Sequence, residues 1–237
     1  MRIAWLGKKS PFCGNVTYCR EITNALLDRG HSIDFLHFTD ESEVSGYSQD
    51  LHHSNSYHNN SQDVSLPFLY KSTIYTLPSP RSSKVLIESL RDLKPDLVHA
   101  SLALSPLDFL LPEICADLNL PLVATFHPPF DIKKRNITSS TQQLTYQIYA
   151  PSLAEYNQVI VFSQIQRSLL HKLGVPERRI VVIPNGVDPN KFSPGYSTIK
   201  QELKAERLYV YQGRLAAEKN VESLLSAWRK LKMPSNC

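Results

Sequence analysis

Residues 207–231 read RLYVYQGRLAAEKNVESLLSAWRKL, and this stretch determines the predicted fold. Its first part, 207–212, is a short run rich in Leu, Val and Tyr, which predicts a β-strand. The strand ends at Gly213, and apolar residues at helical spacing follow it, namely Val221, Leu224, Leu225, Trp228 and Leu231. A strand, a glycine turn and a helix in this order are how doubly wound α/β proteins build an anion site at a helix N-terminus.

Two cations flank the glycine turn. Arg214 follows Gly213 directly, and Lys219 stands where the helix begins. The glycine leaves room for a bulky group, and the two side chains together with the first helical N–H groups can neutralise a diphosphate. The stretch alone is equally consistent with a surface arginine and lysine on an ordinary strand–helix unit. The rest of the chain therefore has to decide between the two interpretations.

Strands and helices alternate along the chain that precedes this stretch. Short apolar runs predict strands at 2–7, 33–38, 96–100, 121–126, 159–162 and 179–183. This alternation predicts a parallel, doubly wound α/β sheet, whose ligands bind beyond the carboxyl ends of the strands. Four residues fall at such ends: Gly14, His127, Ser163 and Asn185. We assign residues 1–190 to this domain, 191–205 to a linker, and 206–237 to the first strand and helix of a second domain.

The composition is that of a globular protein. Of 237 residues, 42% are hydrophobic and 20% are charged. The net charge of +4 weakly favours anionic ligands or an anionic membrane surface, and no aromatic–basic motif predicts a nucleic-acid partner. No apolar run reaches the roughly 18–20 residues that span a bilayer, and the N-terminus is a predicted strand and not a signal peptide.

The cysteines and histidines do not form a metal motif. The four cysteines have no C-x-x-C spacing, which favours reduced thiols and a cytoplasmic location. His52, His53 and His58 lie in a polar segment, 40–65, whose spacing fixes no ligand geometry. We therefore predict no metal site.

Several motifs together resemble family 4 glycosyltransferases, also called group 1 glycosyl transferases. The family's Pro-Asn-Gly-Val-Asp…Phe-x-Pro signature is similar to residues 183–188 (IPNGVD) with Phe192 and Pro194. Its diphosphate motif is similar to residues 213–220 (GRLAAEKN). The family's N-terminal unit is similar to the opening strand, its glycine loop and residues 29–31. The family's Thr-x-His strand end is similar to residues 125–127. The motifs occur in the family's order over nearly the whole chain.

The resemblance implies a GT-B fold, in which two Rossmann-like domains face a cleft. The family transfers a sugar from a nucleotide diphosphate donor with retention of configuration and, as a rule, without a metal. The donor is a substrate, so no cofactor is expected. The resemblance leaves the acceptor, a lipid or a saccharide, unidentified.

The resemblance also implies roles for single residues. Arg214 and Lys219 match the diphosphate clamp, beside Gly213. Gly14 matches a loop glycine that lets the backbone approach the donor phosphate or the acceptor, although Cys13 replaces the first of the family's two glycines. His127 matches the strand-end histidine near the transferred sugar, and the alternative for it is a hydrogen-bonded structural histidine.

The sequence departs from the family at its end. The family's pair of glutamates, seven residues apart in the second domain, has no counterpart before Cys237. We therefore expect a truncated second domain, little or no transferase activity in the chain alone, and weak donor affinity.

Two alternatives stay open. One is a non-catalytic Rossmann-like binding domain, in which the basic residues 133–135 contact the inner face of a membrane peripherally. The other is another GT-B enzyme, such as a nucleotide-sugar epimerase.

Overall fold

The structure is a computed structural model, and it describes residues 1–9, 13–39, 61–72, 75–102, 104–128, 137–213, 215 and 219–231. The chain divides into two compact units, Met1–Asn185 and Gly186–Cys237. The division lies close to the domain limit predicted near residue 190. The two units are described separately below.

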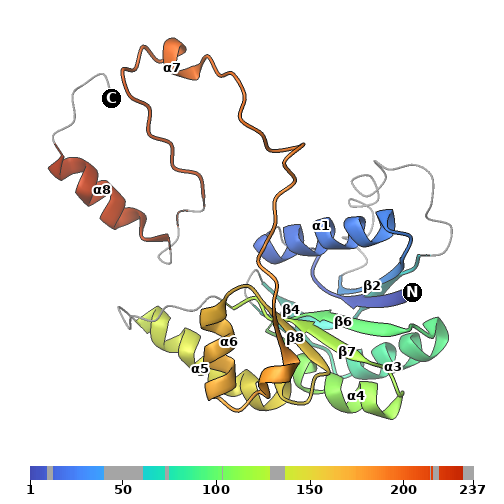
Figure 1. The fold of residues 1–237 in the computed structure, drawn as a ribbon. Helices are drawn as coiled ribbons and strands as arrows, with labels where there is room; N and C mark the ends of the chain where they lie inside the picture. The colour runs from blue at the N-terminus through green and yellow to red at the C-terminus, as the bar shows by residue number, and fades with distance from the viewer. Residues whose placement is uncertain are drawn as a thin grey trace. The chain divides into compact units, whose positions relative to one another are not determined.

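A seven-stranded parallel sheet forms the centre of the first unit (Figure 1). In spatial order its strands are β3 (Asp63–Leu66), β2 (Ser32–Phe38), β1 (Arg2–Leu6), β6 (Leu97–Ser101), β7 (Leu122–Thr125), β8 (Gln158–Val161) and β9 (Ile180–Val182). All neighbouring pairs are parallel. A separate antiparallel pair consists of β4 (Phe68–Lys71) and β5 (Thr76–Pro78). The predicted doubly wound α/β class is confirmed.

Helices cover both faces of the sheet. They are α1 (Gly14–Asp28), α3 (Ser82–Leu93), α4 (Leu111–Asp117), α5 (Ile137–Leu153) and α6 (Gln164–Lys172), with short 3₁₀ turns at Pro106–Phe109 and Glu177–Arg179. Figure 1 shows α1 on one face and α3 and α4 on the other. A fully covered parallel sheet needs strands that are apolar on both sides, and this explains the continuous apolar runs in the sequence.

Strand β1 shows how its side chains divide between the two faces. Ile3 and Trp5 pack with Cys19 of α1 in a small cluster. The alternate residues Ala4 and Leu6 belong to the larger cluster on the opposite face, which contains the buried leucines of α3. Because successive side chains of a strand point to opposite faces, this one buried strand contributes to both hydrophobic cores.

The strand order reverses next to β1. The chain proceeds outward from β1 through β2 to β3, and then returns to place β6 on the other side of β1. In open α/β sheets such a reversal leaves a crevice beyond the carboxyl ends of the two central strands. The residues that follow β1 and β6 therefore face the position where ligands bind in such folds.

The described part of the second unit has no comparable core. It contains α7 (Ile199–Glu202) and α8 (Val221–Lys230), and none of its described residues is buried. The structure assigns no strand to residues 207–212, in contrast to the prediction. A strand needs a neighbouring strand for its backbone hydrogen bonds, and among the described residues no strand pairs with this segment. The helix that was predicted after it is present.

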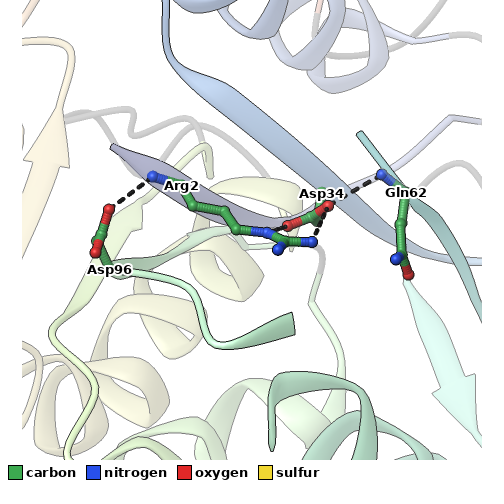
Figure 2. A network of polar contacts seen from close by, with 4 residues as sticks. All are labelled: Arg2, Asp34, Gln62 and Asp96. Atoms are coloured by element: carbon green, nitrogen blue, oxygen red, sulfur yellow. Dashed lines mark hydrogen bonds and ion pairs between the residues drawn. The ribbon is translucent and has the colours of Figure 1, made fainter. Parts of the chain in front are cut away.

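A polar network fixes the amino end of the sheet (Figure 2). The carboxylate of Asp34 is completely buried, and it accepts hydrogen bonds from the Arg2 guanidinium at 2.6 and 3.2 Å and from the Gln62 backbone N–H at 3.0 Å. The backbone N–H of Arg2 donates to Asp96 at 2.7 Å. These bonds join β1 and β2 to the segments that enter β3 and β6. A buried charge is tolerated here because it is paired and hydrogen-bonded.

We expect Arg2→Met to lower the free energy of unfolding by roughly 2–4 kcal/mol, because it leaves a buried carboxylate without its counter-ion. Urea denaturation at pH 7 measures this loss. The control is Arg20→Met, because Arg20 forms its ion pair within the described residues with the exposed Glu21. That change should stay within about 0.5 kcal/mol. Equal losses in the two variants would show that the buried pair has no special role.

Candidate functional site

Polar and aromatic side chains gather at the carboxyl edge of the sheet, where the strand order reverses. Asn15 and Tyr18 lie in the first turns of α1, which follows β1. Ser101 is the last residue of β6, and His127 lies two residues after the end of β7. The parallel pairing of β1 with β6 and of β6 with β7 brings these elements together.

His127 is held by one hydrogen bond and two aromatic rings. Its Nε2 lies 2.7 Å from the Ser101 Oγ. Tyr18 meets the imidazole edge-on with ring centroids 4.8 Å apart, and Phe162, which follows β8, lies 5.3 Å away. The imidazole is partly exposed. These contacts fix the ring and leave part of its surface accessible to a ligand.

Asn15 connects Ser101 to the backbone. Its Oδ1 accepts a hydrogen bond from the Ser101 hydroxyl at 2.8 Å and from the Cys19 thiol at 3.2 Å. Its Nδ2 donates to the Leu102 carbonyl oxygen at 3.3 Å. Three strand–helix units thus meet through a continuous chain of polar groups that ends at His127.

A second set of hydrogen bonds connects to the first through Tyr18. The Thr125 Oγ1 is 3.1 Å from the Tyr18 hydroxyl and 2.9 Å from the His99 Nε2. The His99 ring stacks on Trp5 with centroids 3.9 Å apart. Tyr18, which also contacts His127, is therefore held in place by a hydrogen bond to the buried Thr125.

Burial keeps both histidines of the site neutral. Loss of hydration lowers the pKa of His127 to about 4. The same effect, with repulsion from His127 as a smaller contribution, lowers the pKa of His99 to about 3. At pH 7 His127 therefore acts by hydrogen bonding and cannot supply a positive charge to an anion.

A buried ammonium group lies at the same edge of the sheet. Lys8 follows β1, is only 4% exposed, and donates to the Ser72 carbonyl oxygen at 3.3 Å. Burial lowers its pKa. The sequence analysis did not single out this residue, because a lysine in a loop ordinarily reaches solvent.

The predicted site residues divide between the two units, and some of them lie outside the described residues. His127 lies in the polar cluster, and Gly14 begins α1 with open space around its Cα. Gly213 and the exposed Lys219 belong to the second unit. Arg214 lies outside the described residues, as do 133–135 and the three histidines of the 40–65 segment.

The sequence analysis missed Asn15, Tyr18 and Ser101, and it gave no role to Thr125, which begins the Thr-x-His motif. The rule that selected His127, a polar residue at the end of a buried strand, also applies to Ser101 and Thr125. Asn15 and Tyr18 gave a weaker signal, because polar residues are common in the first turn of any helix.

The described residues contain neither a cluster suited to a metal ion nor a helix suited to a membrane. No group of three or more His, Cys, Asp or Glu residues is placed to hold a metal ion. No helix in the described ranges has the length and apolar character to cross a membrane.

Comparison with protein families gives one extensive match. The family model described as Glycosyltransferase Family 4 matches residues 13–191, which is more than half of the chain. A comparison with curated protein sequences finds no match.

Solved structures share the fold. Alr3699/HepE from Anabaena, in complex with UDP-glucose, superposes with a TM-score of 0.68 at 17% identity, over 100% of this chain and 58% of that one. Sucrose-phosphate synthase from Thermosynechococcus elongatus gives a TM-score of 0.66 at 17% identity, over 98% and 60% of the two chains. The present chain thus spans about 58–60% of the length of these proteins. The likeness confirms the predicted GT-B-like fold class.

We expect Gly7→Ala to destabilise the protein by roughly 1–3 kcal/mol, because a new Cβ would lie 2.9 Å from both the Cys19 Sγ and the Trp5 Nε1. Thermal and urea unfolding measure the change. Gly14→Ala is the matched control, because its Cβ would meet nothing within 4 Å. Its stability should be unchanged or slightly higher. A large loss in Gly14→Ala would contradict this account of the loop.

We also expect stability to fall as the pH is lowered from about 6.5 to 4. His127 has a pKa of about 4 when folded and an ordinary pKa of 6.5, so the unfolded chain binds more protons in this interval. The stability from the neutral imidazole is complete above this range and is lost as the pH falls, by roughly 2 kcal/mol at pH 4.5.

Urea unfolding at several pH values measures this loss. His127→Gln should reduce the slope, whereas His171→Gln, at an exposed position on α6, should leave it unchanged. His99, whose pKa burial lowers to about 3, loses stability over the same interval, so the share of His127 is the difference in slope between the unaltered chain and His127→Gln. The loss from Asp63, whose pKa is also lowered, sets in below about 3.8. A flat profile down to pH 4.5 would refute the assignment.

Proposed function

The chain belongs to glycosyltransferase family 4, and from this premise we propose that it is part of an enzyme that transfers a sugar from a nucleotide diphosphate sugar to an acceptor. The family match over residues 13–191 carries the proposal. The polar cluster at the reversal of strand order supports it, because ligands of open α/β sheets bind at this position. We further propose a retaining, metal-independent hexosyltransferase, as the resemblance implies.

In this proposal His127 contacts the transferred sugar. The imidazole is partly exposed, fixed by Ser101 and two aromatic rings, and neutral at pH 7. Such a group suits sugar hydroxyls, which both donate and accept hydrogen bonds. Gly14 admits the donor phosphate or the acceptor close to the backbone at the start of α1.

The leaving diphosphate needs positive charge that His127 cannot provide. We assign this role to Arg214 and Lys219, which flank the turn after Gly213. Cations placed where negative charge develops lower the barrier of group transfer. Lys219 is exposed in the second unit and so is accessible to a ligand.

We propose a lipid or a saccharide as the acceptor and the cytoplasm as the location, with peripheral contact to the inner membrane face through 133–135. Alr3699/HepE was solved in complex with UDP-glucose, so this donor is the first to test.

A second function, a non-catalytic binding domain, is favoured by one observation. The first unit contains all of the buried residues among those described, and the second contains none. The two functions differ in whether the chain binds a nucleotide sugar.

We expect the chain to bind a nucleotide sugar weakly, with a Kd of about 1 mM. Saturation-transfer NMR with UDP-, GDP-, ADP- and dTDP-sugars measures this binding. Lys219→Ala should weaken it about 10- to 100-fold, the effect of one charged hydrogen bond. Lys230→Ala, at an exposed lysine in the last turn of α8, should not change it.

Equal donor affinity of Lys219→Ala and Lys230→Ala would reject the role of Lys219 in binding the diphosphate. Absence of binding with every donor would favour the non-catalytic domain. With a donor that binds, the anomeric configuration of any transferred sugar, read by proton NMR, distinguishes retention from inversion.

A further inference from the structure

The hydrogen bonds of Asn15 and Ser101 determine which ring nitrogen of His127 carries the proton. The family resemblance gives a role to His127 and assigns nothing to these two side chains. Asn15 belongs to α1 and Ser101 to β6, and both lie next to the reversal of strand order. Their donors and acceptors can be followed one at a time.

The orientation of the Asn15 amide follows from its three partners. The Leu102 carbonyl can only accept a hydrogen bond, so it requires the amide nitrogen at 3.3 Å. The flipped amide would place an oxygen against this carbonyl oxygen. The Asn15 Oδ1 therefore faces the other way, toward the Ser101 hydroxyl at 2.8 Å and the Cys19 thiol at 3.2 Å.

The amide then fixes the role of Ser101. A serine hydroxyl has one proton, and here this proton points to the Asn15 Oδ1. The Ser101 Oγ can therefore only accept a hydrogen bond from the His127 Nε2, 2.7 Å away. An imidazole that donates from Nε2 must carry its proton there.

The other ring nitrogen of His127 is then a hydrogen-bond acceptor. A neutral imidazole has one N–H, so Nδ1 bears a lone pair. No hydrogen bond from a described residue reaches this atom, and it is not among the buried polar atoms that lack a partner. Nδ1 is therefore accessible to solvent and to a ligand.

We propose that Asn15 and Ser101 are positioning residues that hold His127 as the Nε2–H tautomer and so present Nδ1 as an acceptor to a hydroxyl group of the bound sugar. The part that concerns the sugar rests on the proposed function, whereas the tautomer does not. Another lone pair at this position, such as that of a carboxylate or a phosphate oxygen, would repel Nδ1. The site thus selects an uncharged hydroxyl donor at this point of the ligand.

The tautomer can be measured without any ligand. In the full chain labelled with ¹⁵N-histidine, long-range proton–nitrogen correlation at pH 7 distinguishes a protonated from an unprotonated ring nitrogen. His127→Gln identifies the signals of His127. We expect Nε2 protonated and Nδ1 unprotonated in the unaltered chain.

Substitutions of Asn15 and Ser101 test whether these two residues set the tautomer of His127. Ser101→Ala removes the acceptor, and Asn15→Ala frees the serine proton to point at the imidazole. Each should shift the tautomer ratio about tenfold toward Nδ1–H, as expected for the loss of one hydrogen bond. Ser101→Thr keeps the hydroxyl and should retain the original ratio. The control is Ser89→Ala, because the Ser89 hydroxyl donates to the Val85 carbonyl oxygen within α3, away from His127.

A protonated Nδ1 in the unaltered chain would overturn the proposal, and so would an unchanged ratio in Ser101→Ala. The His99 signals show whether each variant is folded, because that ring is buried against Trp5. A second experiment records the His127 nitrogen resonances after addition of the nucleotide sugar that binds in saturation-transfer NMR. Its hydroxyl should move the Nδ1 resonance in the unaltered chain and less in Ser101→Ala. A fixed tautomer without this movement would reject the sugar contact alone.

Discussion

The parallel pairing of β1 with β6 is the interaction on which the site depends. In sequence the two strands are separated by α1, β2, β3, β4, β5 and α3. In the sheet they are nevertheless neighbours, in register from Ile3 opposite Leu97 to Leu6 opposite Ala100. This pairing places the start of α1 beside the end of β6. The contact between Asn15 and Ser101, 86 residues apart, exists only because of it.

Burial has opposite consequences at the two ends of the sheet. At the amino end, Asp34 keeps a charge in the interior because Arg2 and a backbone N–H compensate it. At the carboxyl end, His99 and His127 have no anionic partner among the described residues, and burial keeps them neutral. One end therefore stabilises the fold, whereas the other offers neutral hydrogen-bonding groups to a ligand.

Much of the fold and part of the site could be predicted from local patterns. The alternation of apolar runs and helical stripes indicated a parallel, doubly wound sheet, and the strand-end rule selected His127. The rest required long-range contacts. Residues 207–212 have the composition of a strand, yet no strand among the described residues pairs with them. The composition of a segment indicates its propensity to form a strand, but a strand also needs a neighbouring strand for its backbone hydrogen bonds.

The sequence by itself determined the family motifs, the α/β class, and the position of a histidine at the end of β7. Only the tertiary structure decided which groups surround that histidine and which of its nitrogens carries the proton. The reason is physical. The sequence specifies the donors and acceptors that each residue owns, but the direction of a hydrogen bond follows from what lies opposite, here the Leu102 carbonyl, Asn15 and Ser101.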